Sequence, residues 1–296
     1  MYINDISNSL KQSRIKLFAD DSNVFIIDNN LVNLYKNADN EFSLLSKWIS
    51  SNKLHINYLK TTYMIFKPSK YSLLCDGANQ GFTLKINGQN IEQVFVVKYL
   101  GVFIDDKLDW SDHINSIIKK ISSLSGILSR TDALLPIKCK KNIYFALIHS
   151  ILIYCIEAYG NVSNSKLNPL SVKCNRLLRL LQCKPRCTPL RDLYSNFNIL
   201  PINLLFNFHT LKFIHKCFYN NSFLPVIVRT WFIRGNTLHS HNTRHCNSFI
   251  INSNCNPKSL LFYGPSLWAN IPNYLQNDPS HSSFIRNLSI YLLNSN

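Results

Sequence analysis

The length, composition and charge of the chain are typical of a folded protein that binds a polyanion. Its 296 residues are 46% hydrophobic and 12% aromatic, which excludes an intrinsically disordered chain and allows two or three hydrophobic cores. Only 8 glycines are present, and no GxxxxGK[ST] or GxGxxG motif occurs, which argues against a glycine-rich phosphate loop. The net charge of +16 favours a nucleic acid or an anionic surface as the partner.

The positive charge is concentrated in the second part of the chain. Residues 1–110 carry 12 Lys/Arg and 11 Asp/Glu, a net charge of +1, whereas residues 111–296 carry 20 and 5, a net charge of +15. A polymerase that separates its metal chemistry from its grip on nucleic acid would have this distribution. A basic, solvated surface with no ligand would have it too.

The first predicted element is a β-hairpin within the segment IKLFADDSNVFI, residues 15–26. Hydrophobic runs flank the sequence Asp-Asp-Ser-Asn at residues 20–23, and all four are turn formers, so we expect Asp20 and Asp21 at the turn. Two interpretations stay open. The turn is a solvated connection, or the two carboxylates, which repel each other, bind a divalent cation between them.

The rest of the first third alternates between one helix and short strands. Apolar residues recur at helical spacing over residues 30–51. We expect two short strands at 52–57 and 61–66, a loop at 68–81, a hairpin around Asn87-Gly88, and extended chain over 95–105. Together these elements predict an α+β layer in which the helix packs on a sheet.

The remainder of the chain is predicted to be mainly helical. Hydrophobic residues recur at helical spacing over 111–128, 138–158, 166–182, 189–220 and 280–293. Between residues 221 and 280 only fragments of this periodicity occur. The most apolar stretch, residues 143–160, contains His149 and Glu157, so we expect a buried helix and no membrane span.

The cysteines predict a reducing, intracellular setting without a zinc site. There are nine, an odd number, and the first residues lack the apolar core of a signal peptide. The nearest approach to metal-ligand spacing is Cys183-Lys-Pro-Arg-Cys187, followed later by His239, His241, His245, Cys246 and Cys255. Because no second pair follows at zinc-finger spacing, we expect no zinc site.

Four segments carry motifs that occur together in one group of polymerases. They are LFADD at 17–21, WISSNKLHINYLKTTYMIF at 48–66, VKYLGVFIDDKLDWSDHI at 97–114 and FYGPSLWANIP at 262–272. In this order they resemble the [FY]-x-D-D box, polymerase motif D, the primer grip running into the thumb, and the C-terminal segment of the reverse transcriptases of non-LTR, LINE-type, jockey-like retrotransposons. The resemblance covers nearly the whole chain.

The resemblance implies three regions: a partial palm over 1–110, a helical thumb over 111–190 and a basic C-terminal region over 191–296. It implies an RNA-directed DNA polymerase that uses two Mg²⁺ ions to join a dNTP to the 3′-hydroxyl of a DNA primer on an RNA template. It also implies action in the nucleus, and no obligate protein partner is evident. The implied catalytic residues are Asp20 and Asp21 as metal ligands and Lys60 near the triphosphate, and the implied primer-grip residues are Tyr99, Leu100 and Gly101.

One expected part of the catalytic site has no match in the sequence. The family's site takes a third carboxylate from a motif of the form F-x-x-[FY]-D, and nothing before Asp20 fits it. The finger segments and an endonuclease domain have no match either. We therefore expect a truncated or degenerate polymerase that is inactive as this chain alone. The alternative is a catalytically inactive remnant that binds nucleic acid.

Overall fold

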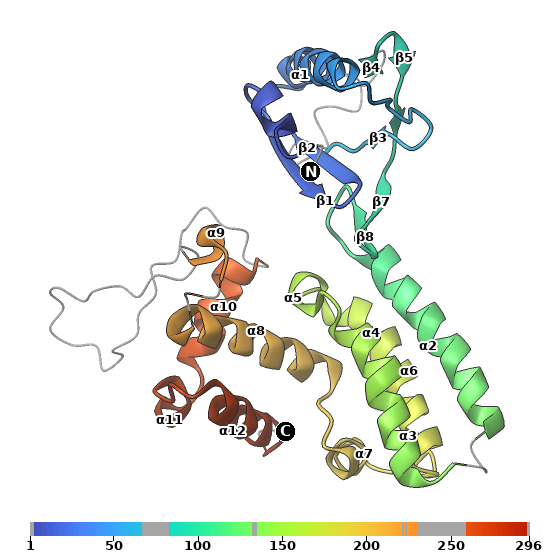
Figure 1. Ribbon diagram of the computed structural model, residues 1–296. Helices are drawn as coiled ribbons and strands as arrows, with labels where there is room; N and C mark the ends of the chain where they lie inside the picture. Colours follow the sequence, from blue (N-terminus) through green and yellow to red (C-terminus); the bar gives the residue numbers. More distant parts are fainter. Residues whose placement is uncertain are drawn as a thin grey trace, which may run out of the picture. The chain divides into compact units, whose positions relative to one another are not determined.

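The chain forms two compact units, Met1–Asp109 and Trp110–Asn296 (Figure 1). The computed structural model describes residues 3–66, 83–131, 135–220, 222, 224–229 and 259–294. The expected loop at 68–81 and the histidine and cysteine cluster at 239–255 lie outside these residues. Helices combine with small sheets, which confirms the α+β class.

In the described residues of the first unit, one long helix and four separate two-stranded sheets are present, instead of the single sheet expected. β3 and β6 pair in parallel, and the other three pairs are antiparallel. The elements are η1 (Ile6–Ser9), β1 (Arg14–Phe18), β2 (Asp21–Phe25), α1 (Leu31–Ser51), β3 (Thr62–Tyr63), β4 (Lys85–Ile86), β5 (Gln89–Asn90), β6 (Glu92–Gln93), β7 (Val96–Tyr99) and β8 (Val102–Asp105).

Helix α1 occupies the predicted range and carries the core of this unit. The side chain of Asn30 accepts a hydrogen bond from the Val32 amide at 2.8 Å, which caps the helix at its N-terminus. Tyr35 and Ala38 of α1 form a buried cluster with Leu84. Partly buried hydrophobic residues surround this cluster, namely Ile26, Leu31, Phe42, Tyr63 and Ile65.

Two tight turns in this unit have the backbone that favours glycine. Asn87-Gly88 joins β4 to β5 with φ angles of 51° and 79°, and Leu100-Gly101 joins β7 to β8 with φ angles of 46° and 84°. Positive φ at both central residues defines the type I′ turn, which matches the twist of a hairpin. The first turn was predicted. The second corrects the expectation of continuous extended chain over 95–105.

The predicted strand over 52–57 is wrong. Lys53 has a φ of 57°, and the Leu54 amide donates to the Ile49 carbonyl at 3.0 Å, which is the geometry of a helix that ends in a Schellman motif. The chain therefore turns back as soon as α1 ends, and only β3 of the two expected strands forms.

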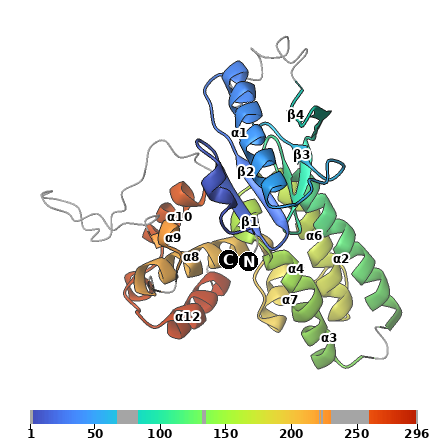
Figure 2. The same cartoon turned by 45° about the horizontal axis from the view of Figure 1, so that its top comes forward.

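The second unit is helical and holds one continuous core. Its helices are α2 (Ser111–Thr131), α3 (Ile137–Ile143), the π-helix η4 (Tyr144–His149), α4 (Ser150–Ile153), α5 (Ile156–Tyr159), α6 (Asn164–Leu181), α7 (Leu190–Phe197), α8 (Ile202–Tyr219), α9 (Val226–Arg229), α10 (Leu260–Ala269), α11 (Asn273–Gln276) and α12 (His281–Asn294). Helices α2 and α6 lie side by side in both views (Figures 1 and 2).

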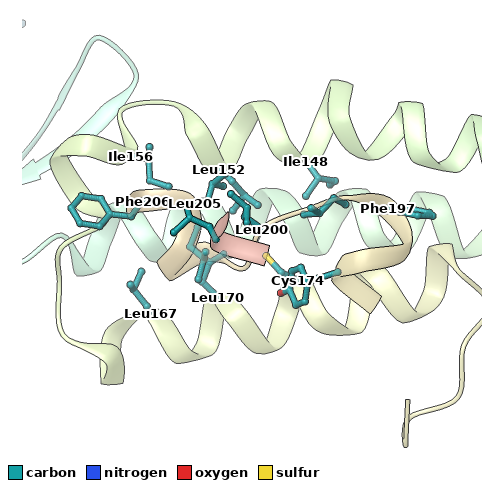
Figure 3. Close-up of a cluster of buried hydrophobic side chains, with 14 of the residues drawn as sticks. Ile148, Leu152, Ile156, Leu167, Leu170, Cys174, Phe197, Leu200, Leu205 and Phe206 are labelled. Atoms are coloured by element: carbon teal, nitrogen blue, oxygen red, sulfur yellow. The ribbon is translucent and has the colours of Figure 1, made fainter. Parts of the chain in front are cut away.

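The core draws on residues from both expected helical regions. Figure 3 shows Ile148, Leu152 and Leu170 of the 111–190 range together with Leu205 and Phe206 of the 191–296 range. These residues belong to one buried cluster. A thumb that ends near residue 190 stays a prediction, since helices on either side of that position share the same core.

The helix expected over 138–158 is interrupted. Tyr154 is extended and Cys155 has a φ of 56°, so α4 ends and α5 begins in a new direction. Tyr159 bridges the break, because its hydroxyl donates to the Leu152 carbonyl. No proline or glycine marks this position, and the interruption is set by tertiary packing. The structure also places α10 and α11 where the sequence indicated only fragments of periodicity.

Candidate active site and nucleic-acid contacts

The carboxylate pair lies at the end of the β1–β2 hairpin. Phe18 pairs with Asp21, so the turn consists of Ala19 and Asp20. Asp20 is therefore a turn residue and Asp21 opens β2. This corrects the predicted four-residue turn over 20–23, because Ser22 and Asn23 belong to the strand. The hairpin itself is confirmed, and it places two adjacent carboxylates on a short, hydrogen-bonded support.

The turn holds an alanine in a conformation that favours glycine. Ala19 has a φ of 51°, while Asp20 has no positive φ. Positive φ at the first central residue alone is the pattern of a type II′ turn. A left-handed conformation costs a residue with a Cβ about 1–2 kcal/mol. The hydrogen bonds of the hairpin offset this cost, and the conformation fixes where the Asp20 side chain leaves the backbone.

Both carboxylates are exposed and share the hairpin with a lysine. Side chains alternate along a strand, and Lys16 pairs with Asn23, so Lys16 is the diagonal neighbour of Asp21 on one face. Carboxylate oxygens are the hard donors that Mg²⁺ takes in proteins. In the part of the chain that the structure describes, no group of three or more His, Cys, Asp or Glu could hold a metal ion. Two carboxylates alone do not complete a Mg²⁺ site, so the pair would be only a part of such a ligand set.

A buried glutamate anchors the segment that leads into this hairpin. Glu41 of α1 is 4% exposed, and its carboxylate accepts hydrogen bonds from the backbone N–H groups of Lys11, Gln12 and Ser13 at 3.2–3.4 Å. The Ser13 hydroxyl also donates to it. Burial raises the pKa of Glu41, but these hydrogen bonds outweigh burial and hold the pKa below its usual value. Sequence analysis missed this residue, because its partners lie nearly thirty positions away.

Lys60 lies in an exposed turn between α1 and β3. Its amide donates to the Asn57 carbonyl at 3.1 Å, and the Thr61 hydroxyl donates to the same carbonyl at 2.9 Å. The turn is locally fixed, while the Lys60 side chain extends into solvent. Its proposed position near a triphosphate stays a prediction.

The three predicted primer-grip residues occupy one hairpin end. Tyr99 closes β7, and Leu100 and Gly101 form the turn before β8. Behind this hairpin lies Asp105, which sequence analysis did not single out. Its buried carboxylate accepts hydrogen bonds from the amides of Lys107 at 3.1 Å and Asp109 at 2.9 Å. The local sequence Asp-Asp-Lys-Leu-Asp is a turn signal that could have indicated it.

The chain is similar to polymerases of insect mobile elements. It is 25% identical over 189 residues to "RNA-directed DNA polymerase from mobile element jockey" of Drosophila melanogaster, which covers 62% of this chain and 20% of that protein. It is 27% identical over 118 residues to the jockey protein of Drosophila funebris, covering 38% of this chain and 13% of the relative. A third relative, "Probable RNA-directed DNA polymerase from transposon BS" of Drosophila melanogaster, is 20% identical over 218 residues, or 72% of this chain and 23% of the relative.

These similarities cover only a part of each relative. The chain spans 20% of the length of the jockey polymerase of Drosophila melanogaster. No family model matches the chain. No solved structure matches it either. No helix in the described residues is long and apolar enough to cross a membrane. The order of motifs and the three matches agree, and the chain is similar to a segment of the RNA-directed DNA polymerases of jockey-like retrotransposons.

Proposed function

We propose that the chain is the part of an RNA-directed DNA polymerase that supplies a metal-binding carboxylate pair, a primer-contacting hairpin and a helical region that holds nucleic acid. The observation that carries this proposal is the hairpin that presents Asp20 and Asp21 in a chain similar to the jockey polymerases. In this proposal the first unit is a partial palm. The thumb is formed by helices of the second unit.

The proposed roles follow from the chemistry of the side chains. Asp20 and Asp21 would hold Mg²⁺, which when bound activates the primer 3′-hydroxyl and stabilises the leaving pyrophosphate. Lys60 would bring an ammonium group to the triphosphate of the dNTP. At the β7–β8 turn, Gly101 has no side chain, so a primer terminus could approach the backbone of Leu100 and Gly101 closely. The RNA template and the DNA primer are the proposed partners, and the nucleus is the proposed place of action.

The surface of the hairpin supports a role within a larger sheet. Phe18, next to the carboxylate pair, is 58% exposed, and Phe25, at the other end of the same hairpin, is 46% exposed. A two-stranded hairpin is marginally stable by itself, and additional strands gain stability by covering exposed apolar side chains of this kind. We propose that palm strands bearing the third carboxylate cover this surface in the active polymerase.

A second candidate function is a nucleic-acid-binding protein without catalysis. The net charge of +15 over residues 111–296 favours it as strongly as it favours a polymerase, since phosphate contacts require only Lys and Arg. The two functions differ in whether Asp20 matters.

A fusion experiment tests the proposed function. Residues 1–296 are joined behind the part of the jockey polymerase that precedes the matched region, and extension of a DNA primer on an RNA template is measured with Mg²⁺. We expect extension that Asp20→Asn abolishes and that Asp28→Asn, an exchange at another carboxylate of the first unit, leaves intact. A fusion that binds primer–template but does not extend it would favour the binding function. Extension that is insensitive to Asp20→Asn would overturn the proposed site.

A further inference from the structure

A basic cavity lies beside the C-terminal part of α6 and the segment that follows this helix. It has a volume of about 550 Å³ and is lined by Arg176, Arg179, Leu180, Lys184 and Arg186. Four of these five residues are cationic, and none is acidic. A volume of this size is within the range of small-ligand pockets.

The backbone brings these side chains together through a Schellman motif. Cys183 has a φ of 50°, the Cys183 amide donates to the Leu180 carbonyl at 3.1 Å, and the Lys184 amide donates to the Arg179 carbonyl at 2.9 Å. The chain therefore reverses directly after α6. This reversal carries Lys184 and Arg186 back to the same cavity as Arg176 and Arg179, which lie three positions apart on the helix.

Arg179 has hydrogen-bonding capacity that its neighbours do not use. Its Nη2 atom donates to the Thr188 carbonyl at 3.4 Å, near the limit for a hydrogen bond. Its Nε atom is buried and has no acceptor among the described residues. A buried donor without an acceptor costs about 1–3 kcal/mol. Arg179 lines the cavity, so its remaining N–H donors are available to an acceptor there.

The electrostatics of the cavity favour an anion. Cations near a helix C-terminus offset the partial negative charge of the helix dipole, but that charge is only about half a unit, so one arginine suffices for it. Four cations exceed it several-fold. Lys140, which is 4% exposed, adds a further positive charge behind the motif, because its Nζ atom donates to the Cys183 Sγ atom at 3.3 Å. The cations repel one another unless an anion lies among them.

We propose that this cavity binds a phosphate group of a nucleic-acid backbone, an assignment that rests on the proposed function and gives the second unit a defined contact with the strand. Arginine presents a planar fork of N–H donors that matches phosphate oxygens, and Arg179 is held at one edge by Thr188. Arg176, Lys184 and Arg186 surround the same phosphate and neutralise its neighbours along the strand. The contact is with the backbone, so it carries no sequence preference.

A charge-matched comparison in the full chain tests the proposal. The cavity variant is Arg176→Gln/Lys184→Gln/Arg186→Gln. The control variant is Lys119→Gln/Lys120→Gln/Arg130→Gln, which removes the same charge from exposed positions of α2. Binding to a fluorescent DNA duplex is measured by anisotropy between 50 and 200 mM salt. We expect the cavity variant to bind about tenfold more weakly than the control at equal salt, because it can no longer donate charge-assisted hydrogen bonds to the phosphate.

The salt dependence gives a second measure from the same titrations. The slope of log K against log salt should be smaller in magnitude for the cavity variant than for the control, by about 0.9 for each duplex phosphate that the cavity no longer neutralises. Equal weakening in the two variants would overturn the proposal, since it would show that binding depends on net charge alone. Absence of binding by the unaltered chain would overturn it as well.

Two further measurements separate the possible sources of the phosphate and the role of Arg179. Inorganic triphosphate at matched ionic strength should displace duplex from the unaltered chain more readily than from the cavity variant, because the two ligands compete for the cavity. Triphosphate that binds to the unaltered chain, and not to the cavity variant, but leaves duplex binding unchanged would mean that the cavity's ligand is a free polyphosphate and would overturn the proposal. Arg179→Lys keeps the charge but removes the planar fork of donors, so it should weaken duplex binding, whereas unchanged binding would overturn the role of Arg179.

A fusion without polymerase activity would refute the proposed function and would leave these binding results unchanged.

Discussion

The hydroxyl of Ser13 donates a hydrogen bond to the carboxylate of Glu41, which lies 28 positions later in the chain. Backbone amides of residues 11–13 donate to the same carboxylate, so one buried side chain of α1 fixes the path that leads into β1. The carboxylate hairpin begins directly after this anchor. Its position therefore depends on a residue of α1 that lies outside the hairpin.

Replacement of this anchor should destabilise the first unit. In Glu41→Gln the amide retains one acceptor oxygen, but its NH₂ group faces backbone donors, so we expect a loss of about 1–3 kcal/mol in unfolding free energy. Urea unfolding measures the loss, and hydrogen exchange at residues 11–18 locates it. Glu92→Gln, at an exposed position of β6, is the control. A similar stability for both variants would contradict the anchoring role.

The stabilisation by Glu41 should also depend on pH. Because its pKa is below its usual value in the folded chain, the folded state holds the ionised carboxylate more tightly than the unfolded state does. The contribution is therefore complete above the unfolded pKa of about 4.3 and is lost as pH falls through the lower, folded pKa. The stability difference between the unaltered chain and Glu41→Gln should shrink over that interval. A difference that is constant from pH 7 to pH 3 would refute the assignment.

Two glycines should respond to alanine in opposite directions. A Cβ on Gly160 would lie 2.5 Å from Cδ2 of Phe206 and 2.7 Å from the Ile156 carbonyl oxygen, so Gly160→Ala forces the core apart and should cost about 1–3 kcal/mol. A Cβ on Gly126, within α2, meets nothing within 4 Å, so Gly126→Ala should stabilise the chain by about 0.5–1 kcal/mol. Thermal or urea unfolding compares the two. Equal changes in unfolding free energy for the two variants would contradict the role of Phe206 in excluding a side chain at Gly160.

Acid should destabilise the second unit through histidines whose pKa values are lowered in the folded chain. Burial, and to a smaller extent nearby His209, lowers the pKa of His149 to about 4. Burial also lowers the pKa of His215, although the Asp278 carbonyl opposes this, and burial and His215 together lower the pKa of His281. The unfolded chain thus takes up protons first, near pH 6.5, and stability should fall as pH drops from about 6.5 toward 4.

A substitution at His149 tests this pH dependence. His149 lies against Tyr144 and Phe145, with ring centroids 6.3 and 5.2 Å away, so His149→Phe places a similar ring in an aromatic setting. We expect the melting temperature of His149→Phe to fall less between pH 7 and pH 5 than that of the unaltered chain. His55→Gln, at an exposed position, should keep the original pH dependence. Parallel pH profiles for all three proteins would count against the role of His149.

Nucleic-acid binding should be dominated by phosphate contacts and therefore by salt. If about five of the Lys and Arg residues in 111–296 touch phosphates, the slope of log K against log salt should be about −4.5 on duplex and about −3.5 on single strands. Fluorescence anisotropy between 50 and 200 mM salt measures both slopes. Binding that is insensitive to salt over this range would contradict the assignment.

The chain of residues 1–296 alone should not extend a primer. Within the described residues no third carboxylate joins Asp20 and Asp21, and Mg²⁺ keeps its waters unless several oxygens are placed around it. We expect no Mg²⁺-dependent incorporation of dNTP on an RNA or DNA template, and no measurable effect of Asp20→Ala. Extension that disappears in Asp20→Ala would show that another carboxylate completes the site, with Asp5 the first to examine.

Features that depend on neighbouring residues could be predicted from the amino-acid sequence. Helix α1 begins at a side-chain cap from Asn30, and the Asn87-Gly88 turn has the positive φ angles that this pair favours. The LFADD motif indicated both the hairpin and the family. Spacing, capping and turn chemistry act over a few residues, so they can be recognised in a linear sequence.

Features that join distant residues depend on the three-dimensional fold. The break at Cys155 occurs without a proline or glycine, Gly160 is required by Phe206 forty-six positions later, and Glu41 is explained by the amides of residues 11–13. The basic cavity likewise depends on a chain reversal at Cys183, a residue that rarely adopts positive φ. In each case the deciding energy comes from packing and hydrogen bonds between segments that are separate in the sequence, and a local pattern does not contain it.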